Sequence, residues 1–328
     1  MAELQARIAE MANRVSSQIF RQFGWERRPH KDADWPCCTK AHKKKTHPSD
    51  VVFYYESPFP KDSGRVYLNT DLKSYAKATI TKEAVENALI SLAMATECAN
   101  KSPDWQKLYQ DTQLNSKVYG MLFIYNHDQE YDKDFKSLLL SITSSLIKVK
   151  AGFRLFIFGP EEIRYLLSIA TDMAILRQES RLPDLEYCRF YLPDLVKLRV
   201  THKELQSASA EMLKMPWQII KYSPQEDKVD QPGYIVYYRG ECSSSDELKF
   251  LLDYFFRFQL VGDKSTILIR APFAVNEATS YFETAKEQYC QKYFGYKDID
   301  SRLKKITLEK VICQQANFST TELGMDPR

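Results

Sequence analysis

Two aspartates and one lysine in the first quarter of the chain have the residue types and spacing of a metal-dependent hydrolytic site. Asp50 opens the β-rich run 50–57, and Asp71 and Lys73 lie two residues apart in a second β-rich run, 65–76. Alternate side chains of a strand share a face, so Asp71 and Lys73 point the same way. If the runs pair, Asp50 approaches Asp71, and two hard carboxylates beside an ammonium group favour Mg²⁺ or Mn²⁺. Such a trio suits phosphodiester hydrolysis, because the metal lowers the pKa of its bound water while Lys73 orients that water and stabilises the transition state.

The tripeptide acid-x-Lys alone is not informative, since it occurs four times, beginning at Asp71, Asp134, Glu226 and Glu247. Asp134 and Glu247 fall in amphipathic helical patterns and Glu226 in a polar segment, where solvated charges are the ordinary interpretation. Asp71 differs because its β-rich run follows another run that begins with an aspartate. The alternative is that Asp50 is a turn residue and that Asp71 and Lys73 form an exposed strand pair.

The elements that would position these residues follow from the hydrophobic pattern. Apolar residues three and four apart predict a first helix that Gly24 ends, and the separator PFPKDSG predicts an antiparallel hairpin. Residues 27–48 are expected to form a solvated basic loop with at most a short strand near Trp25. The expected elements, in order, are a helix at 3–23, strands at 50–57 and 65–76, a helix at 81–99, a strand at 118–126, a helix at 134–149, a strand at 153–159 and a helix at 160–176. This alternation predicts an α/β core in which helices cover a sheet.

With these residues in this order of elements, the sequence resembles the PD-(D/E)xK nuclease superfamily, whose core is a helix, three strands, a helix and a strand. THPSDVVFYY supplies the first acid as Asp50, and YLNTDLKSYA supplies Asp71 and Lys73. The resemblance implies a restriction-endonuclease-like mixed sheet flanked by helices, with Mg²⁺ or Mn²⁺ held by Asp50, Asp71 and the Leu72 carbonyl. It also implies an acid on the first helix, for which Glu10 is the candidate.

More narrowly, the arrangement is similar to nuclease subunits of bacterial anti-phage defence operons of the GAPS type, which work with a second protein. This resemblance implies a partner subunit, or a second copy of the chain, in addition to DNA. The aromatic helix expected at 244–260 is a candidate contact surface, since Phe255, Phe256 and Phe258 cannot all lie on a single buried stripe of the helix.

The distribution of charge supports a nucleic-acid partner. The net charge is +3, but residues 1–80 hold 14 Lys and Arg against 9 Asp and Glu, whereas the remaining residues hold 32 against 34. Basic residues contact phosphates without regard to sequence, although an isolated basic loop is as often merely solvated. The expected phosphate-contacting residues are Lys40, Lys43, Lys44, Lys45, Lys77 and Lys82.

Cysteine usage and hydropathy indicate a cytoplasmic protein with no membrane partner. No window approaches 18 apolar residues, and the seven cysteines are scattered, which fits reduced thiols better than a disulfide framework. Cys37 and Cys38, with His42 and His47 downstream, are the one hint of zinc. Adjacent cysteines chelate poorly and no second knuckle follows, so ordinary loop residues are the favoured interpretation.

The length of 328 residues suggests about two domains. Residues 1–178 are expected to form the nuclease-like domain and 179–232, rich in proline, a connecting region. A smaller α/β module of strand, helix, strand and helix is expected at 233–317, followed by a loose tail at 318–328.

The leading hypothesis is a metal-dependent nuclease that hydrolyses DNA, at ends or at internal sites, in anti-phage defence with a partner protein. Only 10 glycines occur, and no GxGxxG, HExxH or GxSxG motif is present, so dinucleotide enzymes, zinc proteases and serine hydrolases have no support. The rival hypothesis is a non-catalytic α/β scaffold that binds nucleic acid or a protein.

Overall fold

A computed structural model describes residues 2–58, 64–111, 115–142, 147, 149, 152–196, 199–262, 265–294 and 300–311. These residues fall into two compact units, which meet in the sequence at Leu167 and Ser168, eleven residues before the expected boundary at 178. The tail expected at 318–328 lies outside the described residues.

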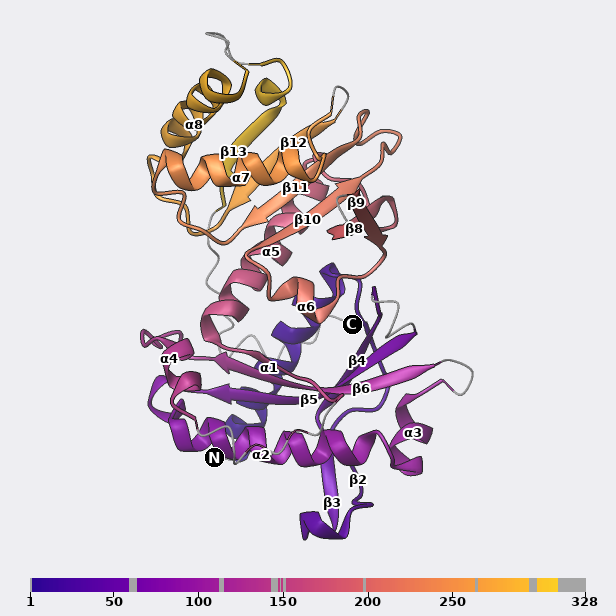
Figure 1. The fold of residues 1–328 in the computed structure, drawn as a ribbon. Helices are drawn as coiled ribbons and strands as arrows, with labels where there is room; N and C mark the ends of the chain where they lie inside the picture. Colours follow the sequence, from indigo (N-terminus) through magenta and orange to yellow (C-terminus); the bar gives the residue numbers. More distant parts are fainter. Residues whose placement is uncertain are drawn as a thin grey trace. The chain divides into compact units, whose positions relative to one another are not determined.

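The first unit is built on a five-stranded mixed sheet (Figure 1). Its order is β1 (Glu26–Arg27), β4 (Val51–Glu56), β5 (Arg65–Tyr75), β6 (Ser116–Asn126) and β7 (Leu155–Phe158). The pairs β1–β4 and β4–β5 are antiparallel, whereas β5–β6 and β6–β7 are parallel. The expected hairpin and the mixed sheet are therefore confirmed.

Two long helices cover the opposite faces of this sheet, α1 (Ala2–Gln22) and α2 (Lys82–Ala99) (Figure 1). On α1, the apolar residues Met11, Val15 and Ile19 are buried, and the Phe20 ring packs against Phe53 of β4 and Phe123 of β6. Gly24, with φ of 74°, ends this segment in a conformation that glycine tolerates best.

The helix α2 begins where Thr81 caps it by accepting a hydrogen bond from the Ala84 amide. It packs closely on β6 because Gly120 has no side chain: a Cβ there would lie 2.5 Å from Thr96 Oγ1 and 2.4 Å from Leu155 Cδ2. Gly120 is the register partner of Asn69. The odd-numbered residues of β5 therefore lie on the face that α2 covers.

The segment expected as a solvated loop, 27–48, is more structured than its composition indicates. It contains a separate two-stranded antiparallel sheet of β2 (Ala33–Pro36) and β3 (Thr46–Ser49), joined across the single turn of η1 (Lys40–His42). Trp35 is buried opposite His47, so a small local core replaces the missing periodicity. The remaining short elements are η3 (Lys77–Thr79), α3 (Pro103–Tyr109) and α4 (Phe135–Leu140), the last shorter than the helix expected at 134–149.

The second unit contains a six-stranded sheet in the order β13-β12-β11-β10-β8-β9. The expected connecting region, 179–232, in fact supplies three of these strands. Four of its five prolines lie in the connections between elements, and Pro193 lies within β8. The strands are β8 (Cys188–Val196), β9 (Arg199–Leu205), β10 (Trp217–Tyr222), β11 (Gly233–Tyr238), β12 (Thr266–Ala271) and β13 (Ile306–Lys310).

Helices α7 (Ser245–Arg257) and α8 (Ala278–Tyr293) share one hydrophobic core with β11 and β12 of this sheet. On the opposite face, Tyr237 of β11 donates a 2.8 Å hydrogen bond to Asp172 of α5 (Pro160–Gln178), and Arg270 of β12 pairs with the same carboxylate. The short elements α6 (Ala210–Leu213), η5 (Leu185–Tyr187) and η6 (Leu303–Lys305) complete the unit.

Candidate active site

The pairing of β4 with β5 places Asp50 opposite Asp71. Val51 is the register partner of Thr70, and Asp50 directly precedes Val51. The Asp50 amide donates a 3.2 Å hydrogen bond to the Thr70 carbonyl, so the two chains stay paired at this point. Directly opposite residues of a pair share a face of the sheet, which brings the two carboxylates together as the sequence predicts.

Asp71 and Lys73 lie on the α2 face of β5. The side chains of neighbouring residues in β5 lie on the other face and are buried or half-buried. Tyr67 and Tyr75 lie on the same face as Asp71 and Lys73, and both pack in clusters that contain α2 residues. The site is therefore at the end of a sheet face that α2 covers, and the side chains of Asp71 and Lys73 are 18% and 31% exposed.

Two short contacts hold the three side chains. The Lys73 Nζ lies 2.5 Å from Asp71 Oδ1, and the Leu72 amide donates a 2.7 Å hydrogen bond to Asp50 Oδ2. Lys73 thus pairs with one carboxylate of the two, while the other is held by the backbone of the residue between Asp71 and Lys73. A role for the Leu72 carbonyl as a metal ligand stays a prediction.

The positive charge near Asp50 and Asp71 does not fully compensate the two carboxylates. Burial and then the charge of Asp71 raise the pKa of Asp50 to about 6, against opposing effects of the Leu72 amide and Lys73. Burial disfavours the charged form of Lys73, but Asp71 and Asp50 together raise its pKa above the ordinary value, so the ammonium stays protonated. A divalent cation would relieve the repulsion that Asp50 experiences, and its preference for hard oxygen ligands fits this pair.

A buried polar network fixes the backbone on both sides of Asp50 and Asp71. Ser49 accepts a 2.9 Å hydrogen bond from the Trp35 indole and donates a 2.5 Å hydrogen bond to the side-chain oxygen of Asn69. The Trp105 indole of α3 donates to both of these groups, at 3.2 and 3.3 Å. Since Ser49 precedes Asp50 and Asn69 lies one same-face position before Asp71, the network positions both acids.

Sequence reasoning missed these neighbours to different degrees. Asn69 could have been found, because the period of two places it on the face of Asp71. Asp32 carries no such signal: it comes from a loop upstream, its amide donates to the Asp50 carbonyl at 2.9 Å, and its charge adds to the rise in the pKa of Asp50.

Glu10, the candidate fourth acid, makes its contacts on its own helix. Glu10 lies on α1, which covers the face opposite to Asp71 and Lys73. Its carboxylate accepts a 2.9 Å hydrogen bond from Asn13 and lies 3.6 Å from the Arg14 side chain, both on the same helix. These contacts are those of a helix surface and give no support to Glu10 as a fourth acid of the site.

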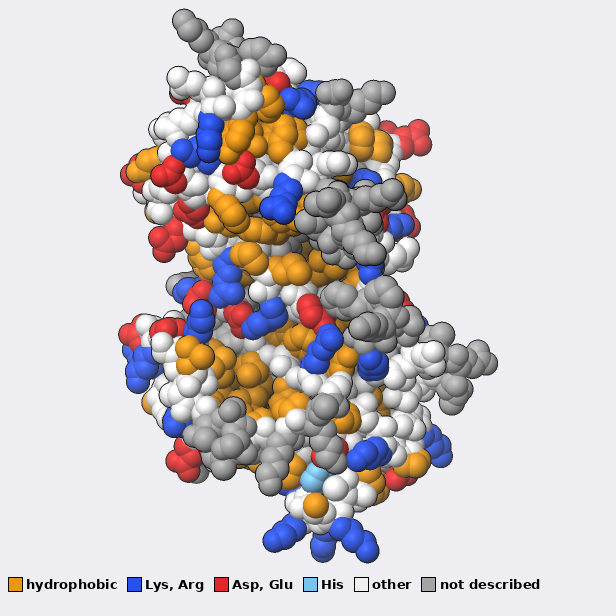
Figure 2. Space-filling model, viewed as in Figure 1, with side chains coloured by type: hydrophobic (Ala, Val, Ile, Leu, Met, Phe, Trp, Pro, Cys, Tyr) orange, Lys and Arg blue, Asp and Glu red, His pale blue; other side chains and the backbone are white. Residues whose placement is uncertain are grey.

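The lysines expected to contact phosphate differ in their surroundings. Lys77 pairs with Asp132 at 2.8 Å, so its charge is already compensated, and Lys44 donates a 3.0 Å hydrogen bond to Ser91. Lys and Arg side chains gather at the tip of the β2–β3 sheet (Figures 1 and 2). The exposed members of the expected set are Lys40, Lys43, Lys44, Lys45 and Lys82.

Comparison with known families assigns the first unit to a nuclease family. Residues 1–162 match the family model of the GAPS4 protein PD-(D/E)XK nuclease domain. Residues 1–162 belong to this nuclease family. The order α1, β1, β4, β5, α2, β6 of the nuclease domain is the order of core elements that the resemblance implies.

No curated protein and no solved structure matches the chain significantly. In the described parts of the chain, no helix is both long and apolar enough to span a bilayer.

Proposed function

We propose that the nuclease domain hydrolyses phosphodiester bonds of DNA with Mg²⁺ or Mn²⁺ held by Asp50 and Asp71. The observation that carries the proposal is the pair of adjacent carboxylates on the α2 face, with the pKa of Asp50 raised to about 6 and the Lys73 ammonium 2.5 Å from Asp71. Two adjacent carboxylates repel each other when both are ionised, and a bound cation relieves this repulsion.

Each residue has a distinct role in this proposal. Asp50 and Asp71 provide carboxylate oxygens for the ion, together with the Leu72 carbonyl. The bound ion supplies charge neutralisation and a lowered pKa for its water. Lys73 stays protonated, so it acts as a hydrogen-bond donor that orients the attacking water and stabilises negative charge on the phosphoryl oxygens. The Leu72 amide holds one oxygen of Asp50 and leaves the other for the ion.

DNA, a protein partner and the setting belong to the same proposal. The exposed lysines between β2 and β3 give a surface for phosphates, whose contribution depends on salt. The match to a GAPS4 nuclease domain supports a role in anti-phage defence, in the cytoplasm, with a second protein or a second copy of the chain. Cleavage at ends and at internal sites are both compatible with the chemistry of the site.

The test combines cleavage with metal binding. The full chain with Mg²⁺ or Mn²⁺ is incubated with circular and linear DNA, and Asp71→Asn and Lys73→Met are expected to abolish cutting while the circular dichroism spectrum is unchanged. Asp134→Asn and Lys136→Met are matched controls, because they alter the same acid-x-Lys tripeptide at the start of α4, where Asp134 caps the helix. The controls are expected to cut at the wild-type rate.

Since a nuclease that needs a partner is inactive alone, a second readout is required. Mg²⁺ is expected to raise the melting temperature of the wild-type chain and of Asp134→Asn, but not that of Asp71→Asn. Metal-independent DNA binding without a metal shift and without cleavage would support the rival scaffold and refute the proposal.

A further inference from the structure

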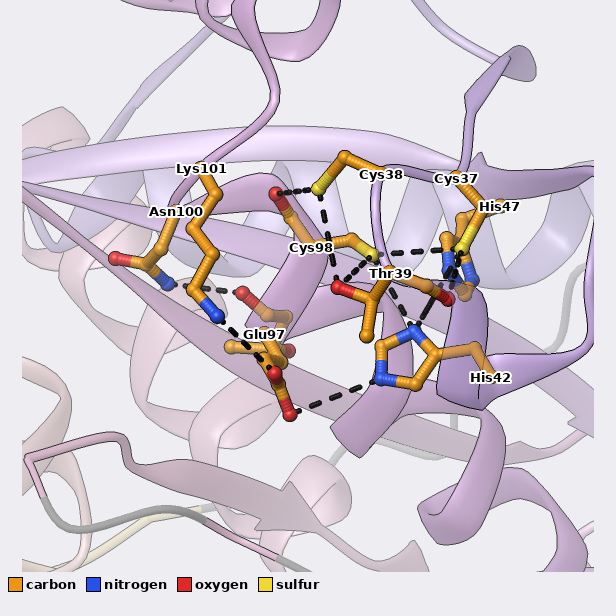
Figure 3. A network of polar contacts seen from close by, with 10 residues as sticks. Cys37, Cys38, Thr39, His42, His47, Glu97, Cys98, Asn100 and Lys101 are labelled. Atoms are coloured by element: carbon orange, nitrogen blue, oxygen red, sulfur yellow. Dashed lines mark hydrogen bonds and ion pairs between the residues drawn. The ribbon is translucent and has the colours of Figure 1, made fainter.

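Four side chains outside the carboxylate site direct nitrogen and sulfur atoms at one point. Cys37 follows β2, His42 ends η1, His47 lies on β3 and Cys98 lies near the end of α2 (Figure 3). One ligand atom of each residue lies within 4.8 Å of the other three. His47 and Cys98 are buried, and Cys37 and His42 are half-buried.

Four of the six distances between these atoms agree with a tetrahedron around a metal. A zinc ion with Zn–S of about 2.3 Å and Zn–N of about 2.05 Å separates two sulfurs by about 3.8 Å, two nitrogens by about 3.4 Å and a sulfur and a nitrogen by about 3.6 Å. The structure has 3.6 Å between the Sγ atoms of Cys37 and Cys98 and 3.4 Å between His42 Nδ1 and His47 Nε2. His42 Nδ1 lies 3.7 Å from Cys37 Sγ and 3.3 Å from Cys98 Sγ.

The surroundings of the two histidines support ligation. The Nε2 of His42 points away from the cluster to Glu97, at 3.7 Å, which is the carboxylate–histidine arrangement that orients metal ligands. His47 is fully buried against Trp35, and its Nδ1 has no hydrogen-bond partner among the described residues. Burying an imidazole in this way costs free energy that a bond from its Nε2 to a metal would offset.

We propose that Cys37, His42, His47 and Cys98 bind one structural Zn²⁺ ion. Two thiolates and two neutral imidazoles make the site electrically neutral, as a largely buried site requires. All four positions are filled by protein, which is typical of structural and not catalytic zinc. The sulfur and nitrogen donors also separate this site from the carboxylates Asp50 and Asp71, whose oxygens suit Mg²⁺ or Mn²⁺.

The positions of the four ligands in the sequence explain why sequence analysis did not favour this site. Cys38, the neighbour of Cys37, is exposed, and its Sγ lies 3.7 Å from the Cys98 carbonyl, so it is not one of the four ligands. The fourth ligand, Cys98, is on a helix that follows the whole β4–β5 hairpin, and no local spacing connects it with Cys37. Zinc would tie the β2–β3 sheet to α2, and β3 leads through Ser49 directly to Asp50.

The experiment measures zinc in the full chain, purified without added metal or chelator, by mass spectrometry of the metal content. About one zinc per chain is expected in the wild type and in Cys38→Ser, the matched control, and a loss of most of it in Cys37→Ser and in Cys98→Ser. Asp71→Asn is expected to keep its zinc, which separates this site from the nuclease site.

Because Cys98 is buried, its variant can fail to fold, so a readout on the wild-type chain is added. Replacement of zinc by Co²⁺ is expected to give the visible absorption of a tetrahedral cobalt–thiolate site, unchanged in Cys38→Ser. A wild-type chain without zinc that also gives no such absorption with Co²⁺ would overturn the proposal. So would loss of two reactive thiols through a Cys37–Cys98 disulfide, or full zinc content in Cys37→Ser.

Discussion

Replacing Asp50 by asparagine should stabilise the metal-free protein while it inactivates the enzyme. The pKa of Asp50 is raised from 3.8 to about 6 because its charge is partly buried beside Asp71. At 1.36 kcal/mol per pKa unit, the charged form costs the folded state about 3 kcal/mol. This cost is absent below pH 3.8, grows as the pH rises through about 6, and is complete above it. Asparagine carries no charge and therefore avoids it.

This cost already includes the hydrogen bond that the Leu72 amide donates to Asp50 Oδ2 at 2.7 Å, which by itself lowers the pKa of Asp50. We therefore expect Asp50→Asn to raise the free energy of unfolding by about 3 kcal/mol at pH 8. At pH 4 most of the gain should disappear, since Asp50 is then largely protonated in the folded state and only partly ionised in the unfolded state.

The assay is urea unfolding in EDTA at pH 4 and pH 8, followed by tryptophan fluorescence. Three of the four tryptophans, Trp25, Trp35 and Trp105, lie in the first unit, and a Trp217→Phe background removes the signal of the second. With Mg²⁺ at pH 8, the wild type should gain stability and the variant should not. A variant that is destabilised at pH 8 without metal, or equally stabilised at both pH values, would refute this account of Asp50.

Three further outcomes are expected. Lys73→Met should lower cleavage by at least about 100-fold, as removal of a transition-state donor does, and single-turnover kinetics will show whether the chemical step is affected. Gly120→Ala should destabilise the first unit by about 1–3 kcal/mol in urea unfolding, because the added Cβ meets Thr96 Oγ1 at 2.5 Å. The double variant Lys43→Ala/Lys45→Ala should weaken DNA binding for all sequences and reduce the slope of log affinity against log salt by about 2, measured by fluorescence anisotropy.

The nuclease fold was predictable from sequence wherever local pattern and tertiary packing agree. The stripe of α1 is periodic, and Met11, Val15 and Ile19 are buried as the period indicates. The hairpin at 50–57 and 65–76 forms as its two β-rich runs and their separator predict. The strands of 179–232 were not predictable in this way, because β8 contains Pro193, β10 adjoins Pro216 and all three gain their stability from neighbours in the sheet. The β2–β3 sheet is similar: the pairing of Trp35 with His47 is a contact that no periodicity announces.

The same distinction applies to the residues predicted for the candidate active site. Asp50, Asp71 and Lys73 come together because a strand register is a local property that two β-rich runs and their separator determine. Glu10 is different, since the side of a sheet that a helix covers depends on the chirality of the connections and on the packing of the other helix. Contacts with Asn13 and Arg14 take up its carboxylate on that helix.

The unequal pairing of Lys73 distinguishes the two carboxylates of the candidate active site. Lys73 contacts Asp71 at 2.5 Å, so the charge of Asp71 is largely compensated, whereas Asp50 has only a backbone amide and the more distant ammonium. Asp50 therefore carries the free-energy cost of the site, and a Mg²⁺ ion bound as we propose would offset that cost. The polar network holds Asp50 and Asp71 together against their mutual repulsion. Ser49 and Asn69 are hydrogen-bonded to the buried tryptophans Trp35 and Trp105, which fixes their positions. In the proposed function, the stability lost at Asp50 is thus coupled to affinity for the ion.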